Sequence, residues 1–209
     1  MPEPRIALKP EFHYHIYNHS VGKENLFTDD ADYVYFLLKL KEYIVPICDV
    51  LCYCLMPNHF HLVLRIKDEI EIRNVISSKS SGHATSINKH ETVDEYFSNH
   101  LSRVFSNFFN TYSKHFNFKA KRQGALFKRA FMRKEITEMK YLLNLICYVH
   151  QNPVSAGFAF KLPEWKYSSY NAIIGQHPTL ILKEDVINLF NDLENFKYCH
   201  SHTVELNGL

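Results

Sequence analysis

Two histidines one residue apart lie inside the apolar segment 53–66, YCLMPNHFHLVLRI. The alternation after the Pro-Asn pair is typical of a β-strand, which would send His59 and His61 to one face and the apolar residues to the other. The two imidazoles would then lie roughly 6–7 Å apart along the strand, near enough to bind one cation. A pair of ordinary surface or core-edge histidines is the simpler interpretation, since the chain has 13 histidines.

A second set of polar residues lies in the segment 137–152, TEMKYLLNLICYVHQN, which has the pattern of an amphipathic helix. Asn144, Tyr148 and Asn152 are four residues apart, so they would form one polar stripe on that helix. Beside a metal ion, the amide oxygen of Asn152 could be a third ligand and the phenolate of Tyr148 a nucleophile. The alternative is that Tyr148 packs against a sheet with its hydroxyl in water.

Strands and helices that could position these residues alternate along the chain. Apolar periodicity predicts strands at 11–20, 47–56, 59–66 and 125–136, and helices at 28–45, 96–112, 137–152 and 183–196. This order favours an α+β fold, with a ferredoxin-like antiparallel sheet, helices packed on it and a C-terminal helical extension.

Turn and cap residues set the expected boundaries of these elements. Pro57 and Asn58 predict a hairpin between two strands. Thr137 is the expected N-cap of the helix that carries Tyr148. Pro153 predicts the end of that helix near Asn152, because proline disfavours helical geometry in the residue before it.

Length and composition describe a globular protein of 209 residues, with 46% hydrophobic and 22% charged residues. We expect one domain over residues 1–175, with a polar, flexible insertion at about 67–95, followed by a helical tail at 176–209. No apolar run reaches the roughly 18–20 residues that span a bilayer, and the N-terminus lacks the core of a signal peptide. The odd number of five cysteines favours reduced, buried thiols, so we expect a cytoplasmic protein with no membrane contact.

Basic residues gather in the segment 114–134, which contains no acid, although the net charge of the whole chain is only +2. Cations neutralise nucleic-acid phosphates, and aromatic rings stack on unpaired bases. The candidate DNA-binding residues in this segment are Arg122, Phe127, Lys128, Arg129, Arg133 and Lys134. The opposing interpretation is that the phenylalanines belong to the core and the cations form a solvated fringe.

Two motifs together resemble the HUH single-tyrosine transposases, especially the REP-associated tyrosine transposases. They are YCLMPNHFHLVL at 53–64 and YLLNLICYVHQNPVSAGF at 141–158. The likeness extends to FHYHIYNHSVGKENLFTDDADYVYFL near the N-terminus, to the basic KRQGALFKRAFMRK, and to WKYSSY, and so spans about residues 11–172.

The resemblance implies a reaction and a set of roles. His59, His61 and Asn152 would hold Mg²⁺ or Mn²⁺, and Tyr148 would attack a phosphate of single-stranded, hairpin-forming DNA to give a 5′-phosphotyrosyl intermediate. The protein would act as a monomer or homodimer. Where many relatives have Arg-Gly after the first strand, this chain has Asn18-His19-Ser20, which leaves the role of that loop open.

Two other functions fit the same residues. One is a DNA-binding protein, domesticated and without catalysis. The other is a binding module held by structural zinc, because a two-residue turn would place Cys54 opposite His61 and Cys52 opposite Val63. Thiols beside imidazoles are typical of zinc sites.

Overall fold

The computed structural model describes residues 6–79, 92–128 and 130–204. Its centre is a four-stranded antiparallel sheet in the order β2-β3-β1-β4. The strands are β1 (His13–His19), β2 (Cys48–Met56), β3 (His59–Ile66) and β4 (Met132–Ile136). Two long helices, α1 (Asp30–Tyr43) and α3 (Val93–Lys119), follow β1 and β3 in the chain. This order and pairing confirm the predicted ferredoxin-like α+β fold.

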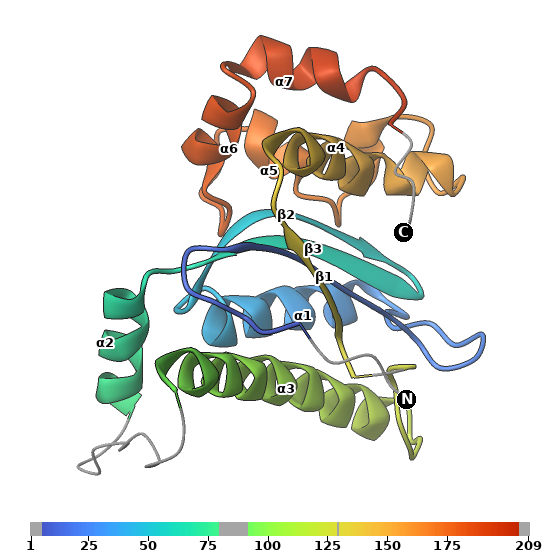
Figure 1. Cartoon of the computed structure of the whole chain (residues 1–209). Helices are drawn as coiled ribbons and strands as arrows, with labels where there is room; N and C mark the ends of the chain where they lie inside the picture. Colours follow the sequence, from blue (N-terminus) through green and yellow to red (C-terminus); the bar gives the residue numbers. More distant parts are fainter. Residues whose placement is uncertain (1–5, 80–91, 129, 205–209) are drawn as a thin grey trace.

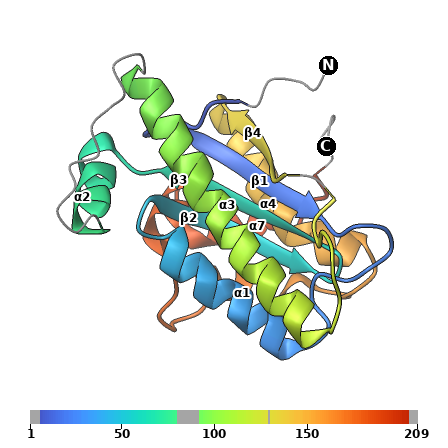
Figure 2. The same ribbon diagram turned by 90° about the horizontal axis from the view of Figure 1, so that it is seen from below.

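The helices form a layer on each side of the sheet. Helices α1 and α3 cover one face, and α4 (Met139–Ser155) covers the other, as Figures 1 and 2 show. The C-terminal helices lie on the α4 side; they are α5 (Tyr170–Ile174), α6 (Lys183–Leu189) and α7 (Leu193–His200), after the short 3-10 helix η1 (Leu162–Glu164). The part of the chain that the structure describes has no helix long and apolar enough to cross a membrane.

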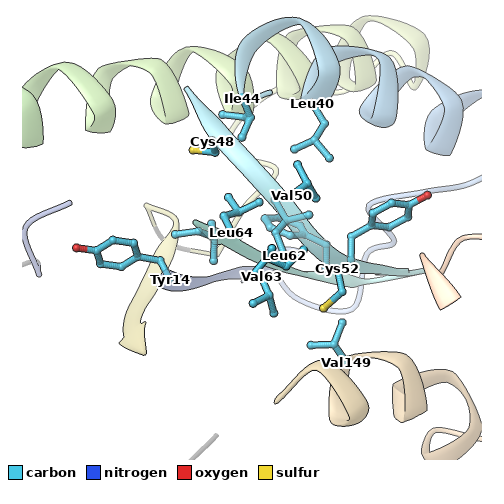
Figure 3. Close-up of a cluster of buried hydrophobic side chains, with 14 of the residues drawn as sticks. Tyr14, Leu40, Ile44, Cys48, Val50, Cys52, Leu62, Val63, Leu64 and Val149 are labelled. Atoms are coloured by element: carbon cyan, nitrogen blue, oxygen red, sulfur yellow. The ribbon is translucent and has the colours of Figure 1, made fainter. Parts of the chain in front are cut away.

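The register of the strands decides which side chains face α4. Pro57 and Asn58 form the predicted two-residue turn, and β2 and β3 then pair Cys54 with His61. A bulge in β2 between Val50 and Cys52 shifts its alternation. Figure 3 shows the result: Val50 lies toward α1, whereas Cys52 lies on the side of Val149 in α4.

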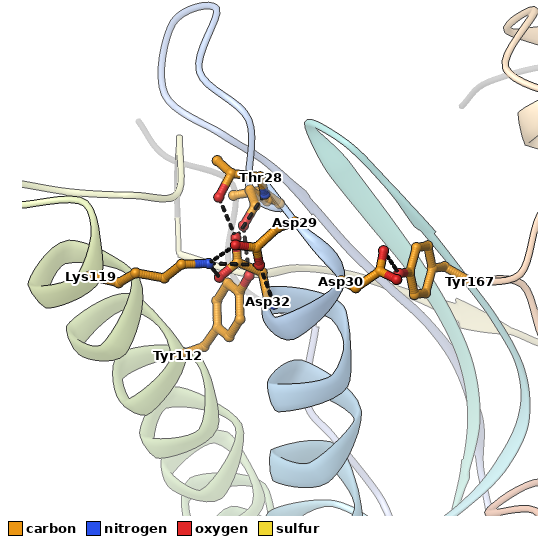
Figure 4. A network of polar contacts seen from close by, with 8 residues as sticks. Thr28, Asp29, Asp30, Asp32, Tyr112, Lys119 and Tyr167 are labelled. Carbon is orange, nitrogen blue, oxygen red and sulfur yellow. Dashed lines mark hydrogen bonds and ion pairs between the residues drawn. The ribbon is translucent and has the colours of Figure 1, made fainter.

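A polar network fixes the N-terminus of α1 against the C-terminal end of α3 (Figure 4). The fully buried Asp32 accepts hydrogen bonds from the backbone and the hydroxyl of Thr28, at 2.7 and 2.6 Å. Lys119 Nζ lies 2.6 Å from Asp32 and 2.7 Å from Asp29. Burial acts to raise the pKa of Asp32, yet the bonds from Lys119 and Thr28 hold that pKa below its ordinary value.

The predicted flexible insertion at 67–95 is wrong for its first part. Residues 69–79 form helix α2 (Glu69–Lys79), in which Ile72 and Ile76 are buried one turn apart. Asp68 Oδ1 accepts a hydrogen bond from Glu71 N, which stabilises the first turn of that helix. The remaining residues of this prediction that precede 92 lie outside the described residues.

The predicted strand at 125–136 is confirmed only for its second half. Residues 125–128, 130 and 131 are irregular, apart from one bridge between Phe127 and Ser20. Gly124 has a φ of 91°, which favours a turn rather than a strand before them. The ring of Phe131 is buried against Phe105 and Phe109 of α3, so packing on a helix replaces strand pairing here.

The predicted end of the fourth helix near Asn152 is also wrong. Helix α4 continues to Ser155, with Pro153 buried inside its last turn. Proline so near a C-terminus removes one hydrogen bond, and the packing of its ring offsets that loss. The N-cap is Glu138 rather than the expected Thr137.

The predicted single helix at 183–196 is two helices, α6 and α7. Asn191 has a φ of 73°, and the side chain of Asp192 accepts a hydrogen bond from Asn195 N to begin α7. Leu182 N donates to Val50 O of β2, at 3.1 Å, and His200 of α7 contacts His150 of α4. The tail therefore packs on the same face of the sheet as α4.

Candidate functional site

The side chains of His59 and His61 meet the amide of Asn152 between β3 and α4. His59 Nε2 lies 3.2 Å from Asn152 Oδ1, and His61 Nε2 lies 3.5 Å from Asn152 Nδ2. Alternation along β3 places the two rings on the face that α4 covers, and their centroids are 5.1 Å apart. The structure thus brings together the three residues that the sequence proposes as metal ligands.

Tyr148 lies one turn before Asn152 on α4. Its ring centroid is 6.0 Å from that of His61, and the two rings meet edge to face. The apolar residues Leu142, Leu145, Ile146 and Val149 are buried on the adjoining side of the helix, and their packing holds Tyr148 and Asn152 over the strand. The histidines and the tyrosine therefore come together within one chain.

The remaining nitrogen of each histidine also has a partner. His59 Nδ1 lies 2.7 Å from Asn58 Oδ1 in the hairpin turn. His61 Nδ1 lies 2.9 Å from Nε2 of His15, a fully buried residue of β1. In metal sites, histidine ligands are generally oriented by such a second hydrogen bond on the nitrogen that does not bind the metal.

The hydrogen bonds around Asn152 test whether these groups fit a cation. If both histidines carry their proton on Nδ1, both Nε2 atoms point lone pairs at one side-chain amide. The amide has one oxygen, so in either orientation one lone pair faces that oxygen. A cation between them removes this repulsion. The set thus fits a metal ion bound by two ring nitrogens and one amide oxygen.

Burial keeps both histidines in the form that binds metals. It lowers the pKa of His61 well below its ordinary value, with the charges of His15, His59 and His19 acting in the same direction. Burial also lowers the pKa of His59, opposed by its hydrogen bond to Asn152. Both imidazoles are therefore neutral at pH 7, as a metal ligand must be.

His19, the last residue of β1, lies at the edge of this cluster, opposite His59. Its exposed ring stacks on His59, with centroids 4.8 Å apart. Burial of part of the ring and the nearby charge of Lys128 lower the pKa of His19. The end of β1 thus places a polar ring beside the candidate metal ligands.

Two of the predicted DNA-binding lysines lie near the histidine cluster. Lys128 N donates to His19 O, at 2.9 Å, and its ammonium is exposed. Lys134 pairs with His15 across β1 and β4, so its side chain shares the face that α4 covers. Its Nζ lies 4.8 Å from the ring centre of Tyr141. These two cations border the candidate site.

Three other predicted DNA-binding residues are engaged elsewhere. Arg122 forms an ion pair with Glu24 at 2.8 Å and a hydrogen bond to Asn117 Oδ1 at 2.6 Å. Arg133 donates to Ser102 Oγ on the α3 side of the sheet. The half-buried ring of Phe127 packs edge to face against Phe60 and Phe109 of the core, and Arg129 lies outside the described residues.

The zinc alternative depends on Cys52 and Cys54. Both thiols are buried, and burial raises the pKa of each in the metal-free protein. Within the described residues, no group of three or more His, Cys, Asp or Glu side chains is arranged to hold a metal ion. Cys54 does lie opposite His61, as predicted, but its Sγ contacts Met56 Sδ at 3.8 Å.

His15 belongs to the site although the sequence does not predict it there. The strand alternation of β1 places His15 on one face with Tyr17, but only the pairing of β1 with β3 shows that this face is the one with His61. The sequence predicts Asn58 as a turn residue, and the structure adds its contact with His59. Its position directly before the His-Phe-His segment was the available signal.

Comparisons with known proteins agree with the motifs. No family model matches the chain. A curated protein of Haemophilus influenzae, named as a candidate REP-associated tyrosine transposase, is 23% identical over 142 residues, which cover 64% of this chain and 70% of the relative. A solved structure of a REP-associated tyrosine transposase bound to a REP hairpin has a TM-score of 0.56 and 13% identity, and covers 85% of this chain and 89% of that chain.

At 13% identity, the similarity to the solved structure shows the fold alone. The resemblance to the family comes from the sequence of the Haemophilus influenzae protein. The chain therefore resembles the REP-associated tyrosine transposases in sequence, as the motifs predict, and has the fold of one of them.

Proposed function

We propose that this protein is a transposase that nicks and rejoins single-stranded DNA beside a hairpin, with Tyr148 as the nucleophile. The observation that carries the proposal is the meeting of His59, His61 and Asn152 around one point, with the ring of Tyr148 6.0 Å from that of His61. The structural neighbour, a transposase bound to a REP hairpin, supports DNA of this form as the substrate.

The reaction exchanges one phosphoester for another. The phenolic oxygen of Tyr148 attacks the phosphorus and loses its proton, and the bond from phosphorus to the 3′ oxygen breaks. The 3′ oxygen takes up a proton, and the 5′ phosphate remains on the tyrosine. A 3′ hydroxyl can then attack the phosphotyrosine, which restores the phosphodiester and frees the enzyme.

His59, His61 and Asn152 would hold the divalent cation through two ring nitrogens and one amide oxygen. When bound, the cation neutralises charge on the phosphate and favours the phenolate of a tyrosine whose ordinary pKa is about 10. Helix α4 contributes orientation, since its apolar side packs on the sheet and holds the adjoining Tyr148 and Asn152 together over β3.

Lys128 and Lys134 are the cations best placed to hold the DNA backbone, because both lie beside the histidine cluster. Arg122 and Arg133 have partners within the protein and would support the basic segment on α3 instead. Phe127 would order that segment by packing rather than by stacking on bases.

The test incubates the protein and Mn²⁺ with end-labelled single-stranded hairpin DNA and measures adducts that survive denaturation. The wild type should form an adduct and Tyr148→Phe none. Tyr141→Phe is the matched control, because Tyr141 lies on the same helix and its hydroxyl has no hydrogen-bond partner among the described residues. Adducts at equal levels in all three proteins would refute the proposal, as would their absence from the wild type with DNA that it binds.

The alternative is a DNA-binding protein without catalysis. It predicts hairpin binding that Tyr148→Phe leaves unchanged and no adduct with any of the three proteins. The same experiment therefore separates the two functions.

A further inference from the structure

His15 is a polar residue at a fully buried position of the sheet, where apolar side chains are usual. It is fully buried in the middle of β1, beneath α4. Its ring stacks on Tyr17 at 4.6 Å and on His61 at 5.1 Å between centroids. Its Nε2 lies 2.9 Å from His61 Nδ1, so the two rings share one hydrogen bond.

The direction of this hydrogen bond decides which nitrogen of His61 carries a lone pair. If His61 Nδ1–H donates to His15, then His61 Nε2 is unprotonated and faces Asn152, where a metal ion can bind it. If His15 donates instead, the proton of a neutral His61 lies on Nε2, and that nitrogen cannot be a ligand. The two arrangements are tautomers of a neutral His61 and differ only in which ring nitrogen carries the proton.

The other ring nitrogen of His15 makes this arrangement destabilising for the fold. His15 Nδ1 is buried and has no hydrogen-bond partner among the described residues. A buried polar atom without a partner is destabilising, so packing alone gives no reason to place histidine here. A role toward His61 does give such a reason. The contact between His59 Nδ1 and Asn58 Oδ1 is a second example of the same arrangement.

We propose that His15 is a positioning residue, which accepts the Nδ1–H of His61 and so keeps His61 Nε2 directed at the cation site as a ligand. This inference rests on the proposed function, because it assumes that His61 binds a divalent cation. It adds a residue from β1, which neither the motifs nor the comparisons assign to the site.

The first experiment locates the protons in the metal-free wild type by ¹⁵N NMR of the histidine rings. His61 should be protonated on Nδ1 and bare on Nε2, and His15 should likewise carry its proton on Nδ1. A His61 protonated on Nε2 would overturn the inference, whatever the activity of the protein.

The second experiment measures the affinity of DNA-free protein for Mn²⁺ by calorimetry, with thermal melting of every variant. His15→Phe keeps a ring but removes the acceptor, and should weaken Mn²⁺ binding by roughly 10–100-fold. His15→Gln restores an acceptor oxygen and should recover most of that affinity. His13→Phe, at the other end of the same face of β1, should bind Mn²⁺ like the wild type.

The outcomes separate the role of His15 from the proposed function. Equal Mn²⁺ affinity in wild type and His15→Phe would overturn the role of His15 alone. A wild type that binds no Mn²⁺ would contradict the proposed function, and with it this inference. If His15→Phe does not fold, the proton positions in the wild type and the affinity of His15→Gln still decide the matter.

Discussion

Tyr148 of α4 and His61 of β3 meet edge to face, with ring centroids 6.0 Å apart. The two residues come from separate motifs of the sequence, and the fold brings them together because α4 packs its apolar side on the sheet. Tyr148 and Asn152, which border that apolar side, then lie over the imidazoles of β3. The function proposed for the protein depends on this one relationship.

Asn152 should contribute to metal binding through its amide oxygen. Asn152→Ala should weaken Mn²⁺ binding by roughly 10-fold or more, because a ligand is lost. Asn152→Asp should bind Mn²⁺ at least as tightly as the wild type, since carboxylates suit this ion. Calorimetry can measure both, with Asn144→Ala, two turns earlier on the same polar stripe, as the control. Equal affinities in all these proteins would exclude Asn152 as a ligand.

Lys128 and Lys134 should carry much of the salt dependence of DNA binding. Each replacement by alanine removes one cation beside the site, and should reduce the slope of log K against log salt by about 0.7 for single-stranded DNA. Fluorescence anisotropy at several salt concentrations measures that slope. Lys39→Ala, whose ammonium pairs with Glu42 on α1, should leave it unchanged. A larger effect at Lys39 than at the two site lysines would place the DNA on a different face.

Asp32 should be important for stability. Asp32→Ala removes buried, charge-assisted hydrogen bonds to Thr28 and Lys119, and should lower the free energy of unfolding by about 2–3 kcal/mol. Lys39→Ala breaks an exposed pair and should cost less than about 0.5 kcal/mol. Urea denaturation compares the two. Similar losses would mean that the network in Figure 4 contributes no more than a surface pair.

Acid should destabilise the packing of the C-terminal helices on α4. His150 Nδ1 lies 2.8 Å from His200 Nε2, and Ser169 Oγ lies 2.7 Å from His150 Nε2. Burial lowers the pKa of His200 to about 4 and that of His150 well below its ordinary value of 6.5. Between pH 6.5 and 4 the unfolded chain therefore binds more protons than the folded protein, and stability falls as the pH falls.

The size of that loss can be measured by urea denaturation from pH 7.5 to 4.5. Each such histidine contributes a slope of at most about 1.4 kcal/mol per pH unit. His200→Phe should be less stable at pH 7.5, because it leaves His150 Nδ1 without an acceptor, and should show a smaller slope below pH 6.5. An unchanged slope in His200→Phe would contradict the assignment of this effect to the pair.

Local pattern predicted the parts of the site that lie within one element. The alternation of polar and apolar residues around the His-Phe-His segment predicts that both histidines lie on one face of β3. The spacing of four residues predicts that Tyr148 and Asn152 lie on one side of a helix. The hairpin followed from Pro57 and Asn58. Each of these features depends on backbone geometry over a few residues, which is why the sequence alone predicts it.

The features that the sequence did not predict depend on packing between distant segments. Pro153 stays in a helix because its ring is buried, and residues 125–131 leave the sheet because Phe131 packs on α3. The partnership of His15 with His61 requires the register of β1 on β3. The region at 67–95 begins as a helix because Ile72 and Ile76 are buried, which its polar, serine-rich composition does not predict.

The central claim is that the residue linked to DNA is the one beside the histidine cluster. Protease digestion of the adduct, followed by mass spectrometry, identifies that residue directly. We predict an oligonucleotide joined through its 5′ phosphate to the side chain of Tyr148, formed only with a divalent cation and lost in His59→Ala and His61→Ala. A 5′ link to any other tyrosine, or an adduct that forms without His59 and His61, would contradict it.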